Sequence, residues 1–130
     1  MLFVLVVSLA GCSKSESTAP AAQTSDPKPS GSKPAKDPAT ARKLIAEGAF
    51  VLDVRTPDEY AAGHLANAAN VPIQEFAQRM AEVEKLAGAD KARPVVVYCA
   101  AGGRATKAKQ QLEAAGYTNV VNGGGFDDLR

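Results

Sequence analysis

The chain has 130 residues, of which 45% are hydrophobic and 22% are charged, so it has room for one small soluble domain and whatever lies at its ends. Its 15 Lys and Arg against 14 Asp and Glu leave a formal net charge of +1. Because this balance supplies no basic field, we do not expect nucleic acid to be a partner.

The first segment is almost wholly apolar from Met1 and runs into Leu9-Ala10-Gly11-Cys12. It resembles a bacterial lipoprotein signal, which implies cleavage before Cys12 and lipid on the sulfur and new amine of that cysteine. We therefore expect residues 1–11 to be a signal peptide. A transmembrane anchor is the alternative, but the apolar run of about ten residues is shorter than the roughly 20 that span a bilayer.

This resemblance implies a place in the bacterial cell envelope, facing the periplasm, with the membrane as a partner through the lipid anchor. Ser13, rather than Asp, follows the cysteine, which favours the outer membrane over the inner one. Because no Lys or Arg precedes the apolar run, we expect the natural signal to begin upstream of Met1.

Residues 12–36 form the second segment. After Cys12 it is rich in Ser, Thr, Ala, Pro and Lys and has no Ile, Leu, Val, Phe or Tyr. Such a composition cannot bury enough apolar area to offset the entropy of ordering, so we expect a disordered tether. Its lysines are better explained by solubility than by attraction to anionic lipid headgroups.

The third segment, residues 37–130, alternates helical and strand patterns. Asp37-Pro38 predicts a helix start, and Gly48 predicts its end. Strands are expected at 50–54, 70–71, 95–99 and 119–121, and helical spacing occurs at Ile73, Phe76, Ala77, Met80, Val83 and Leu86 and over 104–115. This order predicts an α/β domain of three layers, a small parallel sheet with helices on both faces, with ligands bound at the carboxyl ends of the strands.

Cys99 ends one of these expected strands and is followed by Ala100-Ala101-Gly102-Gly103-Arg104 and a helix. A strand-to-helix loop directs backbone N–H groups and the positive end of a helix dipole at its centre, which favours a thiolate or a bound anion. Gly102 and Gly103 let the backbone curl, and Arg104 has a planar fork for an anionic ligand. The alternatives are an inert core cysteine and, for Arg104, an ordinary surface residue.

Three groups of residues carry a family resemblance. The segment from Leu52 to Tyr60, with Gly63-His64-Leu65 and Ala69-Asn70-Val71-Pro72, resembles the upstream signature of the rhodanese domain. Cys99 to Arg104 resembles the active loop of that domain, and Gly116-Tyr117, Val120-Val121 and Gly123-Gly124-Gly125 resemble its closing segment. With a lipoprotein signal in front, the chain is similar to the single-domain periplasmic rhodaneses of the phage-shock type.

The resemblance implies a sulfurtransferase with Cys99 as its catalytic residue. A donor such as thiosulfate passes its outer sulfur to the thiolate, and cyanide or a thiol acceptor then removes that sulfur from the persulfide. The substrate-binding residues would be those of the loop, Ala100, Ala101, Gly102, Gly103 and Arg104. The two alanines replace polar or basic residues that are common in this loop, which leaves the preferred donor open.

The resemblance also implies a scaffold beneath the loop. Arg55 is expected to pair with Glu59 and brace the loop, and Asp53 is expected to hold nearby backbone amides. His64, the only histidine, suggests a Cys–His dyad, but in this family the Gly-His pair is structural. Lysines at 107 and 109 are candidates for positive potential near the loop, although the second is expected to face water.

Two other function classes remain open at this stage. Tyrosine-type phosphatases, and arsenate reductases built on the same fold, use a similar loop with five residues between cysteine and arginine, whereas this chain has four and places Tyr98 before the cysteine. A tethered binding module with an incidental Cys99 is the third possibility. No metal or organic cofactor is expected, since one histidine and one free cysteine cannot build a structural zinc site.

Overall fold

A computed structural model describes residues 36–130. The expected signal peptide, the expected lipidation site Cys12 and the rest of the expected tether up to residue 35 lie outside the described residues. Within 36–130 the strands are β1 (Phe50–Asp53), β2 (Ala68–Asn70), β3 (Val95–Cys99) and β4 (Val120–Gly125). They form one parallel sheet in the order β2-β1-β3-β4, so the expected α/β fold is confirmed.

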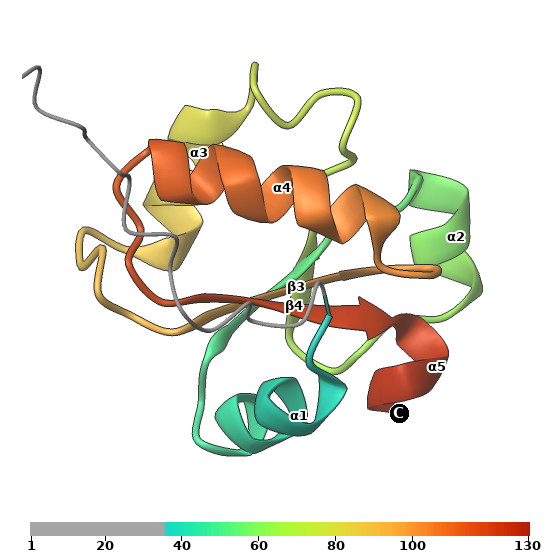
Figure 1. Ribbon diagram of the computed structural model, residues 1–130. Helices are drawn as coiled ribbons and strands as arrows, with labels where there is room; N and C mark the ends of the chain where they lie inside the picture. Colours follow the sequence, from blue (N-terminus) through green and yellow to red (C-terminus); the bar gives the residue numbers. More distant parts are fainter. Residues whose placement is uncertain (1–35) are drawn as a thin grey trace, which may run out of the picture. The chain divides into compact units, whose positions relative to one another are not determined.

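Helices cover both faces of the sheet (Figure 1). On one face lie α1 (Pro38–Ala46) and the short α5 (Phe126–Leu129), and on the other lie α3 (Met80–Ala87) and α4 (Gly103–Ala114). A further short helix, α2 (Pro57–Ala62), follows β1. This is the expected three-layer arrangement, and in the described residues no helix is long and apolar enough to cross a bilayer.

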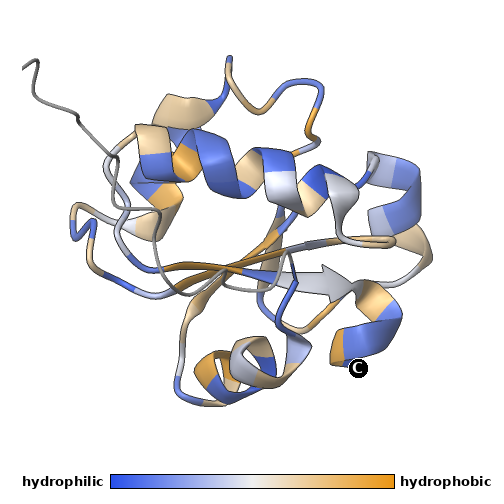
Figure 2. Ribbon diagram, viewed as in Figure 1, coloured by the Kyte–Doolittle hydropathy of each residue, from blue (hydrophilic) through white to orange (hydrophobic). Residues whose placement is uncertain are grey.

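The central strand β3 supplies side chains to both layers of the core. Val95, Val97 and Cys99 pack in the hydrophobic cluster beneath α3 and α4, whereas Val96 and Tyr98 pack in the cluster against α1 and α5. This alternation follows from the two-residue period of a strand. In Figure 2 the inner strands are coloured as hydrophobic, and the helices mix hydrophobic and hydrophilic residues. This two-residue alternation therefore places the Cys99 side chain on the face of the sheet that α4 covers.

The sequence placed one helix incorrectly. The apolar spacing from Ile73 predicted a helix there, but turns occupy that stretch and α3 begins only at Met80. Phe76 is fully buried from within those turns, which explains why it matched the apolar pattern. Leu86, expected on the buried face of the helix, is 46% exposed, and Val83 and Ala87 are the buried residues of α3.

Candidate active site

The sulfur of Cys99 lies at the carboxyl end of β3, beside the loop that leads into α4. The Gly102 N–H donates a hydrogen bond to Sγ over 2.9 Å. Cys99 itself is only 1% exposed, while Ala100, Ala101 and Gly103 are exposed. The thiol therefore contacts apolar core residues on one side and the main chain of a surface loop on the other.

Two opposing effects set the pKa of the Cys99 thiol. Burial raises the pKa, because a thiolate loses hydration. Hydrogen bonds from the backbone N–H groups of Ala105, Ala101, Gly102 and Arg104 lower it, and together they outweigh burial. The net pKa lies below the ordinary thiol value, so the loop favours the nucleophilic form of the sulfur.

Two glycines allow this loop to form. Gly102 has a φ of +103°, a left-handed conformation that an L side chain rarely adopts, and this conformation accompanies the hydrogen bond to the sulfur. Gly125, at the end of β4, approaches the loop so closely that a Cβ there would collide with the Ala100 carbonyl oxygen. The role of Gly102 was expected from its place in the loop, whereas the role of Gly125 depends on a close approach between segments that are distant in the chain.

Asn122 of β4 is a buried polar residue that the sequence analysis did not select. Its side-chain amide donates to the Gly102 carbonyl over 3.0 Å and to Thr106 Oγ1 over 2.8 Å, and its Oδ1 accepts from the Gly124 N–H over 2.8 Å. Asn122 thereby ties β4 to the active loop at Gly102 and to the first turn of α4 at Thr106. Its only sequence signal is an amide beside three glycines at the end of an apolar strand.

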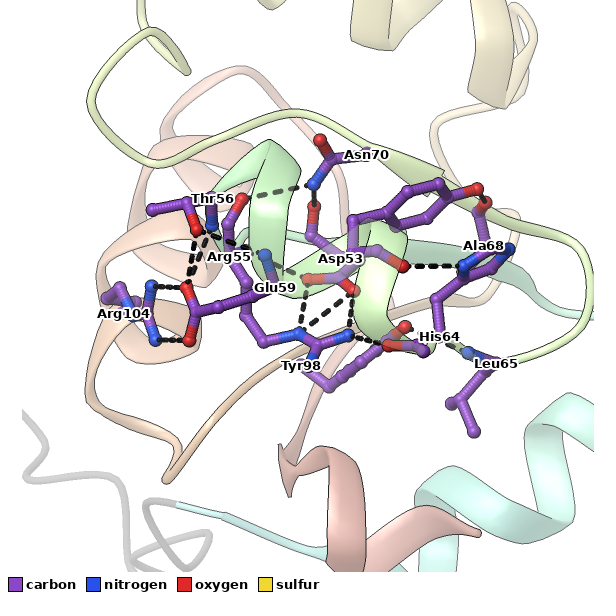
Figure 3. Close-up of polar contacts among 12 residues, drawn as sticks. Asp53, Arg55, Thr56, Glu59, His64, Leu65, Ala68, Asn70, Tyr98 and Arg104 are labelled. Carbon is purple, nitrogen blue, oxygen red and sulfur yellow. Dashed lines mark hydrogen bonds and ion pairs between the residues drawn. The ribbon is translucent and has the colours of Figure 1, made fainter.

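The guanidinium fork of Arg104 is engaged by a carboxylate (Figure 3). Its two terminal nitrogens donate to the two oxygens of Glu59 over 2.7 and 2.9 Å. Thr56 caps α2 and also donates to Glu59 from its N–H and its hydroxyl, each over 3.0 Å. Hydrogen bonds from Arg104 first, and then from Thr56, lower the pKa of Glu59 to about 2.

The expected pairing of Arg55 with Glu59 is wrong. Arg55 pairs instead with Asp53, with Nε 3.0 Å from both carboxylate oxygens and Nη2 2.6 Å from Oδ2 (Figure 3). The same nitrogen donates to the Gly63 carbonyl over 2.6 Å. Asp53 also accepts the Arg55 N–H over 2.9 Å, which agrees with its expected hold on backbone amides. Both residues are buried, so they form an ion pair inside the scaffold.

His64 contacts a tyrosine. Its Nδ1 is 2.9 Å from the Tyr60 carbonyl oxygen, and the two rings stack with centroids 3.7 Å apart. In the described part of the chain these contacts join His64 to Tyr60 and not to Cys99, which agrees with the structural role that the resemblance implies. Lys109 of α4 pairs with Glu113 over 2.9 Å, and Lys107 is exposed. Residues 36–130 hold no cluster of three or more metal-ligating side chains.

Comparison with known proteins gives a family match and close relatives. The model of the rhodanese-like domain family matches residues 37–129. The thiosulfate sulfurtransferase PspE of Escherichia coli is 41% identical over 78 residues, which cover 60% of this chain and 71% of that protein. The thiosulfate sulfurtransferase GlpE of Pseudomonas entomophila is 35% identical over 91 residues, covering 69% and 78% of the two chains.

Solved structures agree with this assignment. A rhodanese with anions from Escherichia coli has a TM-score of 0.54 and 39% identity, covering 62% of this chain and 89% of that one. A human single-domain sulfurtransferase has a TM-score of 0.58 and 30% identity, covering 68% of this chain and 88% of that one.

Proposed function

The chain belongs to the family of rhodanese-like domains and is a sulfurtransferase of that type; from this premise we propose that it moves sulfane sulfur from thiosulfate, or a related donor, through a persulfide on Cys99. The acceptor is cyanide or a small thiol. The hydrogen bond from Gly102 N–H to Sγ, together with the lowered pKa of this thiol, is the observation that supports the proposal.

The first half-reaction builds the persulfide. The Cys99 thiolate attacks the outer sulfur of thiosulfate, a new S–S bond forms, and the S–S bond of the donor breaks. Sulfite leaves with the electron pair of that bond. The N–H donors of the loop then face a terminal persulfide anion instead of a thiolate, so they stabilise negative charge before and after the transfer.

The second half-reaction restores the enzyme. Cyanide attacks the outer sulfur of the persulfide, a C–S bond forms, and the S–S bond breaks as the Cys99 thiolate leaves. A thiol acceptor reacts in the same way through its thiolate and carries the sulfur away as its own persulfide. Because the two substrates act in turn on one sulfur, this is ping-pong covalent catalysis.

The remaining loop residues have supporting roles in this proposal. Gly102 supplies a donor to the sulfur, and Ala100, Ala101 and Gly103 form the exposed main chain over which a donor approaches. Arg104 contributes its own N–H group and a positive charge, while its fork remains on Glu59. Asp53 and Arg55 hold the end of the neighbouring strand β1.

Turnover measured on one preparation tests the proposal. We expect wild-type protein to form thiocyanate from thiosulfate and cyanide, with parallel double-reciprocal plots, and Cys99→Ser to lose this activity completely. The same samples are offered an aryl phosphate and arsenate. Hydrolysis of the phosphate or reduction of arsenate, without thiocyanate formation, would contradict the proposal, and so would full activity in Cys99→Ser.

We also propose that the chain is held at the bacterial envelope by lipid on Cys12, with residues 12–36 as the tether and the enzyme facing the periplasm. The tetrapeptide Leu9-Ala10-Gly11-Cys12 and the composition that follows it support this proposal. In this arrangement Cys99 is the remaining cysteine, with no second one to form an intramolecular disulfide.

A further inference from the structure

The active loop offers little free positive charge to an anionic donor. Ala100 and Ala101 are uncharged, and both terminal nitrogens of Arg104 are committed to Glu59. Lys109, one of the two α4 lysines, is paired with Glu113. The sulfonate end of a dianion such as thiosulfate loses hydration when it binds, and a nearby cation offsets part of that loss. Lys107 is exposed on α4 but does not line the depression beside the loop, so a cation in that depression comes from a different segment.

Lys36 lies beside the loop although it precedes the first helix by two positions. It lines a depression of about 280 Å³ together with Ala101, Gly102, Gly103 and Thr106. Its Cδ would be 3.6 Å from a Cβ placed on Gly102 and 3.2 Å from one placed on Gly124. The lysine stem therefore lies across the glycine surface of the site, and Lys36 is the only charged residue that lines this depression in the described chain.

The backbone keeps Lys36 in this position. The N–H of the next residue, Asp37, donates to the Asn122 carbonyl over 2.7 Å, and the Asp37 side chain caps α1 by accepting from Thr40 N–H over 3.0 Å. Asn122 in turn contacts Gly102, whose N–H reaches the sulfur. Lys36 is thus anchored to the same network that shapes the active loop.

The ammonium group of Lys36 can exchange partners easily. Its Nζ is 3.5 Å from Asp128 Oδ2, and the two side chains are 53% and 39% exposed, which makes the pair long and well hydrated. Asp128 keeps other partners without it, because its Oδ2 accepts the Gly125 N–H over 2.9 Å and Arg42 also contributes to the lowered pKa of this carboxyl. An anion in the depression can therefore replace Asp128 as the partner of Lys36 at a small cost in free energy.

We propose that Lys36 is a substrate-binding residue that holds the negatively charged end of the sulfur donor in the depression outside the active loop. This inference rests on the proposed sulfur transfer through Cys99. Lys36 acts on the sulfonate and not on the reacting sulfurs, so it sets the KM for anionic donors and leaves kcat nearly unchanged. Its positive charge compensates for the uncharged Ala100 and Ala101. The choice of sulfur donor then depends in part on Lys36, the residue that joins the domain to the preceding segment.

The test compares two donors that differ by one charge. Thiosulfate is a dianion, whereas methanethiosulfonate is a monoanion with the same transferable sulfur and a methyl group in place of one oxygen. For thiosulfate at low ionic strength we expect Lys36→Gln to raise KM about threefold and Lys36→Glu about tenfold, with smaller changes for methanethiosulfonate. Added salt should shrink these differences, and Lys36→Arg should restore the wild-type KM.

Lys85→Glu on α3 is the matched control, because it makes the same change in net charge at a position outside the site. An unchanged thiosulfate KM in Lys36→Glu, or equal changes in Lys36→Glu and Lys85→Glu, would overturn the inference while sulfur transfer itself stands. Equal effects on the two donors at all salt concentrations would also overturn it, because they indicate a steric role. If wild-type protein accepts sulfur from neither donor, the proposed function fails first and the inference with it.

Discussion

At the scale of single residues, the lowered pKa of Cys99 comes from main-chain donors and not from a neighbouring base. The sulfur accepts the Gly102 N–H over 2.9 Å, while His64, the only histidine, stacks on Tyr60. A fixed set of N–H groups lowers the thiol pKa without needing a proton acceptor of its own. We therefore expect the conformation of Gly102, one of these donors, to affect the pKa of Cys99.

Asn122 offers the sharpest test of this point. Asn122→Ala removes the donor to the Gly102 carbonyl and the acceptor for the Gly124 N–H, and both groups are buried. We expect the loss to destabilise the fold by about 1–3 kcal/mol and to raise the pKa of Cys99 toward the ordinary thiol value. The pH dependence of Cys99 alkylation by iodoacetamide measures the pKa, and denaturant unfolding measures the stability.

Asn122→Asp serves as the matched variant. It retains the acceptor for Gly124 but cannot donate to Gly102 or to Thr106. If the donor to Gly102 sets the loop conformation, this variant should show an upward movement of the alkylation profile at least as large, because its new carboxylate also disfavours the thiolate. An alkylation profile identical to wild type in both variants would show that the loop keeps its shape without Asn122.

At the scale of elements, α2 connects the strand β1 to the active loop. Thr56 caps the helix and orients Glu59, whose two oxygens hold the fork of Arg104 in the first turn of α4. Because a bidentate carboxylate–guanidinium pair fixes orientation as well as distance, α2 holds the side chain of Arg104 in the first turn of α4. This helix acts on the site through Arg104 and not through a hydrogen bond to the sulfur.

The depressed pKa of Glu59 predicts a pH dependence of stability. Hydrogen bonds from Arg104 and Thr56 lower the pKa of this carboxyl from 4.5 to about 2, so its contribution is fully present above pH 4.5 and is lost as the pH falls toward 2. Glu59→Gln lacks this contribution at every pH. We expect wild type to exceed Glu59→Gln in unfolding free energy by about 1 kcal/mol near neutrality, a figure discounted for the one-third exposure of the pair.

Denaturant titrations between pH 2 and pH 7 measure this difference. The gap between wild type and Glu59→Gln should close over the acid range named above, while Glu47→Gln, at the exposed C-cap of α1, should follow wild type throughout. A gap that stays constant from pH 7 to pH 2 would rule out the carboxylate as its source.

Local signals were enough to predict β3, which carries Cys99, and the start of α1. The apolar run 95–99 gave β3 with its correct bounds, and Asp37-Pro38 gave the start of α1, because strand alternation and N-capping depend on adjacent residues. Glu59 was assigned to Arg55, four residues away, but its partner is Arg104, which is 45 residues away. Competition between two arginines for one carboxylate is decided by tertiary placement, which spacing along the chain does not encode.

At the scale of the whole molecule, the domain consists of two hydrophobic clusters that share the strand β3. One cluster lies beneath α3 and α4 and includes Cys99, and the other lies against α1 and α5 and includes Tyr98. The active loop begins at the end of β3, the strand that both clusters share. Packing on both faces therefore holds the base of the loop, while Ala100, Ala101 and Gly103 on its outer side are exposed.

The proposed anchoring on Cys12 gives a prediction for the complete chain in a bacterial cell. Wild-type protein should partition into the detergent phase of Triton X-114 and incorporate labelled palmitate, and Cys12→Ser should do neither. Cys99→Ser is the matched control, because it also replaces one cysteine but should keep the label. Labelling that persists in Cys12→Ser, or is absent from wild type, would contradict the proposed anchor.

The central claim is that Cys99 carries sulfur as a persulfide, and intact-mass measurement tests it most directly. After exposure to thiosulfate, wild-type protein should gain the mass of one sulfur atom, lose it on addition of cyanide with release of one equivalent of thiocyanate, and gain it again in a second cycle. Cys99→Ser should keep its original mass throughout. A wild-type mass that thiosulfate leaves unchanged, or a gain of equal size in Cys99→Ser, would contradict the account.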